Sequence, residues 1–344
     1  MDLHLLVPGD PATLTGGYLY DQRIAQGLRE RGWHVFVHAL DASFPLPSRA
    51  ALEDADALLS SLPDAATVVI DGLAFGGMPA LAERHATRLR LFALVHHPLA
   101  DETGLDAESR ALLLARERRA LAAARGVIVT SRFTARSLTV YGVDPARIAV
   151  VEPGVDPAPA AAGGDGRTLA LLCVATLTPR KGHDLLLEAL ARLGDRPWRL
   201  ECVGDRLRNP VTTAALLARC ARLGLADRVD FRGAVDAATL ARYYDRSDVF
   251  VLASWHEGYG MALTEALARA LPIVSTTAGA IPETVPAEAG LLVPPGDVEA
   301  LTAALARVLD DADERARLAA GARAVRASLP SWGLSSARFE QAIA

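Results

Sequence analysis

The sequence is poor in cysteine and in aromatic residues, and the cysteines limit what kind of protein it encodes. Three cysteines occur in 344 residues, an odd number without metal-ligand spacing, which excludes a disulfide framework and a cysteine-based metal site. Cys173, Cys202 and Cys220 lie in apolar or helical surroundings. We therefore expect them to be reduced and buried, as in a cytosolic protein.

Long runs of one charge or of apolar residues are also missing. The formal net charge is −5 without an extended basic run, so we expect no nucleic-acid partner. No segment has the apolar length of a membrane span. The opening sequence MDLHLLVPGD lacks the basic start and apolar core of a signal peptide, so a cytoplasmic location is expected. Repeats, heptads and His/carboxylate pairs at metal spacing are likewise absent from the sequence, and no metal is expected.

What the sequence does contain is a repeated alternation of short apolar runs and helical segments. Hydrophobic residues make up 51% of the chain, enough for two cores. Runs at 3–8, 35–39, 67–70, 90–96, 127–130 and 148–151 predict strands in the first half. Further strands are predicted at 169–174, 198–203, 228–232 and 248–253. This alternation predicts doubly wound parallel sheets, whose ligands collect beyond the carboxyl ends of the strands.

A segment rich in Pro, Ala and Gly separates the two halves. Residues 153–168 lack any periodicity and are typical of a linker. We predict a first domain over 1–157, a linker over 158–168, a second domain over 169–329 and a final helix over 330–344.

The stretch 247–274 carries the clearest chemical signal. It predicts a strand, a glycine-containing turn and a helix over 261–270, so backbone amides at the helix start would form a seat for phosphate. Two acids bracket the turn, Glu257 and, after seven intervening residues, Glu265. The alternative is a helix with an ordinary acid at its first turn and a solvated Glu265.

The string E-G-Y-G-M-A-L-T-E-A resembles the E-x7-E signature of the retaining glycosyltransferases of family 4. The resemblance implies the GT-B fold, an α/β architecture of two Rossmann-like domains facing across a cleft. It also implies that Glu257 approaches the donor sugar and that Glu265 binds the nucleotide ribose. The implied diphosphate-binding residues are Gly258, Tyr259, Gly260 and Met261.

The segment T-P-R-K-G places two cations before a helix start, which suits a leaving diphosphate. Solvated surface charge is the alternative. The resemblance assigns Arg180 and Lys181 to the donor site. The chain departs from the family there, since Ala175 and Thr176 occupy the position where an Arg follows a Gly, and we expect Arg180 to replace that guanidinium.

Glycines at other strand ends complete the predicted donor site. Gly204 and Gly233 each follow a predicted strand, on the same edge. The segment F-R-G-A-V resembles the family element whose backbone lines the base pocket. The implied base-pocket residues are Gly233, Ala234 and Val235.

In the first half, polar residues follow three predicted strands: Asp71, the pair His96 and His97, and Ser131. A histidine at a strand end is either a hydrogen-bond donor to a ligand or a satisfied structural residue. The resemblance implies that His96 lies near the donor sugar, with His97 as second choice. The glycine pair Gly16 and Gly17 is either a turn or, as the resemblance implies, a close approach to the donor.

Taken together, the resemblance implies a metal-independent retaining transferase of the hexosyltransferase type. Its partners would be a nucleotide-sugar donor and a hydroxyl acceptor, without any further cofactor. The residues do not specify the sugar, the base, the acceptor or the oligomeric state. Two alternatives are a GT-B epimerase or phosphorylase and a non-enzymatic sugar-nucleotide-binding protein. Asp101 to Glu117 form an acidic loop that leads into a helix with recurring arginines, Arg110, Arg116, Arg118 and Arg119, and we expect a solvated face there rather than a membrane contact.

Overall fold

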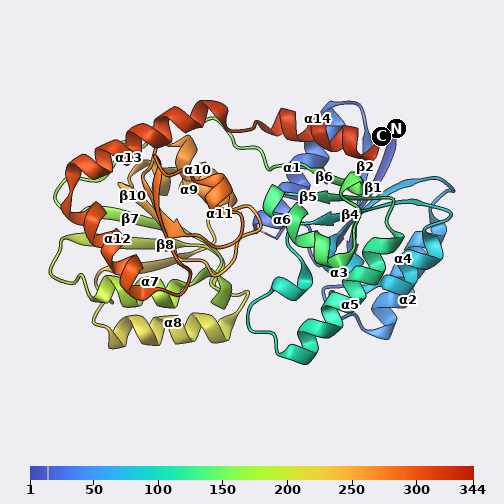
Figure 1. Cartoon of the computed structure of the whole chain (residues 1–344), viewed down its shortest axis with the longest axis horizontal. Helices are drawn as coiled ribbons and strands as arrows, with labels where there is room; N and C mark the ends of the chain where they lie inside the picture. The colour runs from blue at the N-terminus through green and yellow to red at the C-terminus, as the bar shows by residue number, and fades with distance from the viewer. Residues whose placement is uncertain (14) are drawn as a thin grey trace. The chain divides into compact units, whose positions relative to one another are not determined.

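The apolar runs and intervening helices fold into two separate units, each built on one parallel sheet (Figure 1). The computed structural model describes residues 1–13 and 15–344. Unit 1 comprises Met1–Gly154 and Pro330–Ala344, and unit 2 comprises Val155–Leu329. The chain therefore passes from one unit to the other twice, because its last segment returns to unit 1.

Unit 1 contains a six-stranded sheet in which all neighbouring strands are parallel, in the order β2-β1-β3-β4-β5-β6. Its strands are β1 (Asp2–Pro8), β2 (His34–Leu40), β3 (Thr67–Asp71), β4 (Arg90–Val95), β5 (Gly126–Val129) and β6 (Ile148–Val150). Its helices are α1 (Gly16–Glu30), α2 (Arg49–Ser61), α3 (Gly72–Gly77), α4 (Pro79–His85), α5 (Ala107–Ala123), α6 (Arg132–Ser137) and α14 (Trp332–Ile343). Helices α3 and α4 pack against α5, and α14 packs against α1.

Unit 2 repeats this design with a parallel sheet in the order β12-β11-β10-β7-β8-β9. Its strands are β7 (Leu169–Val174), β8 (Trp198–Val203), β9 (Val229–Gly233), β10 (Val249–Leu252), β11 (Ile273–Thr276) and β12 (Gly290–Val293). Its helices are α7 (His183–Ala191), α8 (Pro210–Arg222), α9 (Ala237–Asp245), α10 (Met261–Ala268), α11 (Ile281–Thr284), α12 (Val298–Asp310) and α13 (Ala312–Val325). The buried strands form the centre of one continuous core.

The C-terminal helix α14 is an integral part of unit 1. It lies beside α1, and the two chain ends lie close together in Figure 1. Phe339 and Ile343 are fully buried, and the Ser335 hydroxyl donates to the Glu152 carbonyl at 2.7 Å. At Gly27 of α1 a Cβ would lie 2.0 Å from Ser336 Oγ, so a side chain there would prevent this close packing.

Each sheet has a switch point, where the chain leaves two adjacent strands in opposite directions. In unit 1 the order places it between β1 and β3, and in unit 2 between β7 and β10. Loops diverge at such points and leave a crevice beyond the carboxyl ends of the strands, where ligands of doubly wound sheets bind. The residues after β1, β3, β7 and β10 are therefore the first place to look for a site.

The predicted strands are all present, and all ten match within a residue at each end. Helix α10 begins at Met261, as predicted, because Gly260 has φ +92° and cannot continue a helix backward. Glu265 therefore lies in its second turn, and the helix ends at Ala268, two residues before the predicted end. Strand β11 was not predicted, because its four residues follow Pro272 without a turn signal between them.

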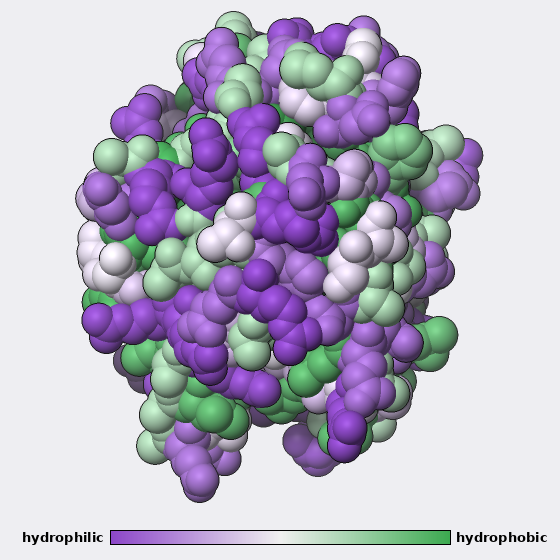
Figure 2. All heavy atoms as spheres, turned by 90° about the vertical axis from the view of Figure 1, so that its right-hand side faces the viewer, coloured by the Kyte–Doolittle hydropathy of each residue, from purple (hydrophilic) through white to green (hydrophobic). Residues whose placement is uncertain are grey.

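The three cysteines are free and buried, as predicted. Among the described residues, no helix is long and apolar enough to cross a bilayer. On the face of unit 1 drawn in Figure 2, hydrophobic side chains are scattered among hydrophilic ones.

Candidate functional site

At the switch point of unit 2, the loops after β7 and β10 lie directly against each other. The first loop ends in a 3-10 turn, Pro179–Lys181, and passes into α7 through Gly182. Gly182 has φ +64°, and a Cβ there would lie 1.9 Å from the Ala253 carbonyl oxygen. Only glycine permits both this backbone conformation and this approach. The loop that carries the two predicted cations is thereby fixed beside the loop that carries the first predicted acid.

Lys181 and Glu257 form a buried ion pair between these loops. Lys181 Nζ lies 2.7 Å and 2.9 Å from the two carboxylate oxygens of Glu257. The Ser254 hydroxyl donates to the same carboxylate at 2.6 Å. The side chains of Lys181 and Glu257 are 17% and 6% exposed. Both carboxylate oxygens are therefore bonded within unit 2 itself.

These contacts determine the charge of Glu257. Burial would raise the pKa of its carboxyl, but the positive charges of Lys181 and Arg180 and the hydrogen bonds from Lys181 and Ser254 hold that pKa at about 2. Burial in turn lowers the pKa of Lys181, against the opposing effect of Glu257. Glu257 is therefore an anion throughout the physiological pH range.

Arg180 lies at the outer side of this pair. Its Nη1 donates to the His256 carbonyl at 2.8 Å and lies 3.9 Å from Glu257 Oε2. The Trp255 amide donates to the Arg180 carbonyl at 2.8 Å, which joins the two loops through the backbone as well. Two cations thus stand at the loop edge where the resemblance implies a diphosphate.

The predicted diphosphate turn, Gly258 to Met261, leads directly into the N-terminus of α10. In the second turn of this helix, Glu265 accepts a hydrogen bond from the buried Tyr244 hydroxyl at 2.8 Å. The guanidinium of Arg269 lies over the Tyr244 ring, 4.5 Å from its centroid. Glu265 is therefore held by a neighbouring side chain and is not the solvated surface acid of the alternative interpretation.

The predicted base-pocket residues lie at the ends of β8 and β9. Gly204 follows β8, and its amide donates to the carbonyl of Gly233, the last residue of β9. Ala234 and Val235 then lead toward α9 and are exposed and half-buried, respectively. They are on the same strand-end edge as Lys181 and Glu257, because all strands of the sheet are parallel.

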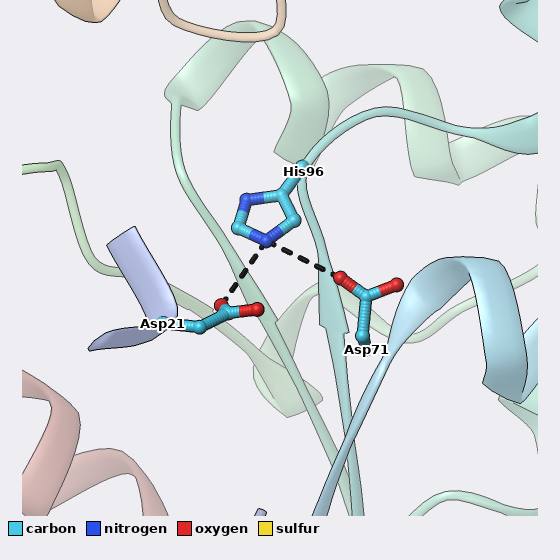
Figure 3. Close-up of side chains that lie close together, drawn as sticks. All are labelled: Asp21, Asp71 and His96. Carbon is cyan, nitrogen blue, oxygen red and sulfur yellow. Dashed lines mark ion pairs between the residues drawn. The ribbon is translucent and has the colours of Figure 1, made fainter. Parts of the chain in front are cut away.

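At the strand ends of unit 1, His96 lies between two buried aspartates (Figure 3). The three side chains come from α1, from the end of β3 and from the residue after β4. His96 Nε2 lies 3.3 Å from Asp21 Oδ1 and 3.5 Å from Asp71 Oδ2. At this spacing the three donor atoms, all within 4.8 Å of one another, could share a proton or a cation.

The charges of this group depend on one another. Burial alone would lower the pKa of His96, but the two carboxylates raise it to about 10. Burial raises the pKa of Asp21 to about 6, against the effect of His96. The other oxygen of the Asp71 carboxylate accepts from the Leu73 amide at 2.8 Å and caps α3.

The remaining predicted residues of unit 1 fall around this group. Gly16 and Gly17 are the first two residues of α1, and a Cβ at Gly17 would lie 3.5 Å from His96 Nε2. His97 is directed elsewhere, since its Nε2 lies 3.3 Å from Glu102. Ser131 caps α6 by accepting from the Thr134 amide. The structure therefore joins His96, rather than His97, to the glycine pair and Asp71.

Sequence reasoning missed three residues of the two groups: Asp21, Ser254 and Tyr244. Asp21 lies one helical turn after Gly17, so its spacing from the glycine pair was a usable signal. Ser254 lies three residues before Glu257 on the same loop. Tyr244 gave no signal, because it lies in α9 and reaches Glu265 only through the fold.

Comparison with known proteins gives two family matches. The family described as "Glycosyl transferases group 1" matches residues 168–311, and "Glycosyltransferase Family 4" matches residues 57–159. The chain belongs to glycosyltransferase family 4. The family matches therefore cover the strands and loops that carry Lys181 and Glu257 in unit 2, and Asp71 and His96 in unit 1.

Curated relatives of this family-4 chain include a D-inositol 3-phosphate glycosyltransferase of Kineococcus radiotolerans, 34% identical over 58% of this chain and 52% of the relative. An MMP alpha-(1->4)-mannosyltransferase of Mycolicibacterium hassiacum is 34% identical over 63% and 54%. The chain spans about half the length of the curated relatives it matches.

Solved structures of similar fold include the sucrose-phosphate synthase of Thermosynechococcus elongatus, with a TM-score of 0.82 at 22% identity, covering 99% of this chain and 97% of that one. Anabaena HepE in complex with UDP and glucose has a TM-score of 0.78 at 18% identity, covering 98% of both chains. These similarities confirm the predicted GT-B fold of two Rossmann-like domains.

Proposed function

We propose that this family-4 protein is a retaining hexosyltransferase that moves a sugar from a nucleotide-diphosphate sugar to a hydroxyl acceptor, without a metal ion. The observation that carries the proposal is the buried Lys181–Glu257 pair, held beside Arg180 and the N-terminus of α10 at the switch point of unit 2. This edge of the sheet brings together an anion, two cations and a helix N-terminus. The cations and the helix N-terminus suit a departing diphosphate, and the anion suits the positive charge that develops on the sugar.

In the proposed mechanism each of these groups has a separate role. Arg180, Lys181 and the amides from Gly258 to Met261 stabilise the negative charge that builds on the departing diphosphate. The Glu257 carboxylate compensates the positive charge that develops on the sugar. Glu265, oriented by Tyr244, binds the ribose hydroxyls, and the backbone from Gly233 to Val235 receives the base.

The proposal requires no nucleophile from the protein. The acceptor hydroxyl attacks from the side on which the diphosphate leaves, and the new bond keeps the configuration of the old one. The departing diphosphate can take the acceptor's proton. Support for a nucleotide-sugar donor comes from the relatives, which are named glycosyltransferases, and from a neighbour solved with UDP and glucose. The cytoplasmic location stays a prediction.

Donor screening followed by product analysis tests this proposal. Unfolding temperatures are measured with UDP, UDP-glucose and GDP-mannose, because a ligand at a hundred times its dissociation constant adds about 2.7 kcal/mol of stability. The donor that binds is then incubated with hydroxyl acceptors, beginning with D-inositol 3-phosphate because relatives carry that name. The anomeric configuration of the product is read by NMR, and EDTA is included as the test of metal independence.

The same assay separates the alternatives. A changed sugar without an added acceptor indicates an epimerase, and dependence on free phosphate indicates a phosphorylase. Donor binding without turnover indicates a binding protein. Inversion of the anomeric centre or loss of turnover in EDTA would contradict the corresponding part of the proposal.

A further inference from the structure

The His96 group in unit 1 contains buried polar atoms that lack close hydrogen-bond partners, and burying such atoms costs free energy. Asp21 is 4% exposed, and neither of its carboxylate oxygens has a hydrogen-bond partner in the part of the chain that the structure describes. His96 Nε2 lies between the carboxylates at 3.3 Å and 3.5 Å, longer than the usual 2.7–2.9 Å of charge-assisted bonds. A single N–H shared between two acceptors cannot make a well-aligned hydrogen bond to both of them.

Of the groups described around the His96 ring, the two carboxylates are the charged ones. Asp21 faces it from α1 and Asp71 from the end of β3. Tyr20, also on α1, meets the ring edge-on at 5.4 Å, and its hydroxyl donates to the Val151 carbonyl instead. Gly17 adds no side chain. The two negative charges therefore determine the protonation of the ring.

The charge balance favours a protonated ring. With neutral His96 the group carries two buried negative charges within 4.8 Å of one another, which is costly in a low-dielectric site. A proton on the ring reduces the net charge to one negative and gives both carboxylates a cationic partner. The pKa of His96, raised to about 10, agrees with this balance.

We propose that Asp21 and Asp71 are positioning residues that hold His96 as an imidazolium, so that its Nδ1 always carries a proton. In Figure 3 this nitrogen lies on the side of the ring away from both carboxylates. A neutral ring protonated at Nε2 would instead offer a lone pair there. The carboxylates thereby convert Nδ1 from an acceptor into a fixed donor.

A fixed donor limits what can bind beside it. The ligand atom that meets Nδ1 must be an oxygen with a free lone pair. Because the whole group keeps a net negative charge, a neutral sugar hydroxyl fits this position better than a phosphate or carboxylate. This ligand assignment rests on the proposed function, whereas the charge state of His96 does not.

The charge state is measured by NMR on the full-length protein with labelled histidine, and His96→Gln identifies the signal. We expect the His96 ring to remain protonated well above pH 7 in the unmodified protein. Asp21→Asn and Asp71→Asn should each lower its pKa by at least one unit. Asp71→Asn keeps a side chain suited to cap α3, so it serves as the folded variant if Asp21→Asn fails to fold.

A matched control lies in the same unit. Asp56 Oδ1 is 2.8 Å from His85 Nε2. Asp56→Asn should alter the signals of His85 and leave those of His96 unchanged. A His96 signal that also moves in Asp56→Asn would show that any lost carboxylate has the same effect, and would overturn the proposal.

Three further results would overturn it: a His96 pKa near 6.5 in the unmodified protein, no change of that pKa in either aspartate variant, or one equivalent of bound metal that is lost in Asp21→Asn. Saturable perturbation of the His96 signals by inorganic phosphate would overturn the preference for a neutral ligand. If no donor and acceptor react, the proposed function fails while these spectra still decide the charge state. If transfer is found, the alkaline limit of kcat should shift to lower pH in both aspartate variants.

Discussion

The polar groups at the two switch points differ in how completely they are bonded. In unit 2, Glu257 receives close contacts from Lys181 on both carboxylate oxygens and from Ser254 on one of them. In unit 1, the contacts of His96 with Asp21 and Asp71 are longer, and the Asp21 oxygens have no hydrogen-bond partner among the described residues. The Glu257 carboxylate therefore has its hydrogen-bond partners without a ligand, whereas the Asp21 carboxylate can still accept hydrogen bonds. We therefore expect mutations of the Lys181–Glu257 pair to reduce folding stability, and mutations of the His96 group to change mainly its charge state.

The largest effect is expected from Lys181→Met, which leaves the buried Glu257 carboxylate without its close cation. Loss of one partner of a buried pair costs about 3–5 kcal/mol. Urea denaturation should show this loss, and the double variant Lys181→Met with Glu257→Gln should recover most of it, since no buried charge remains unpaired. Equal stability of the single and double variants would show that the unpaired Glu257 carboxylate is not the cause of the loss.

Two glycine variants sharpen the comparison. Gly182→Ala should lower the unfolding free energy by about 2 kcal/mol, because φ is +64° and the Ala253 carbonyl occupies the space of a Cβ. Gly17→Ala should leave stability unchanged or raise it by about 0.5–1 kcal/mol, because alanine favours helix and its Cβ meets the His96 ring at an ordinary contact distance of 3.4 Å. Donor binding should nevertheless weaken in Gly17→Ala. Undiminished binding would remove Gly17 from the ligand site.

The pH dependence of stability should also separate the two units. The pKa of Glu257, at about 2, is below its ordinary value of 4.5, so its contribution is complete above 4.5 and is lost as pH falls toward 2. The pKa of His96, at about 10, is above its ordinary value of 6.5, so its contribution is complete below 6.5 and is lost as pH rises toward 10. Glu257→Gln should flatten the acid limb, and His96→Gln the alkaline limb, each by on the order of 1–2 kcal/mol. Denaturation midpoints measured across pH test both.

The smallest effect is expected at Glu265, the residue proposed to bind the ribose hydroxyls. Tyr244→Phe removes the hydrogen bond to Glu265 and should weaken UDP binding by about 1 kcal/mol, or roughly fivefold, without preventing folding. Isothermal titration with UDP measures this effect. Tyr243→Phe is the matched control on the same helix, and an equal loss in both variants would show that Tyr244 does not orient Glu265.

Most of the fold was predictable because its signals are local. The strands are short apolar runs, and the parallel order follows from their alternation with helices. The start of α10 was predictable for the same reason, since the Ala- and Leu-rich run that favours helix begins at Met261, directly after Gly260. Strand β11 was missed because a buried strand of four residues has no periodicity of its own.

The candidate site was predictable in unit 2 and only partly in unit 1. Glu257, Lys181 and Arg180 stand in motifs that can be read along the chain, and the structure brings them together. Asp21, Asp71 and His96 come from three elements whose contact depends on the order β1-β3-β4 and on the rotation of α1. Such a group has no sequence motif, because no two of its members are close along the chain.

The return of α14 to unit 1 has a consequence for cutting the chain in two. A protease cut between 155 and 168 would give an N-terminal fragment that lacks this helix and a C-terminal fragment that carries it. The buried contacts of Phe339 and Ile343 would then hold the two fragments together without a covalent bond. A nicked protein should therefore elute as one species from a sizing column and separate only in denaturant.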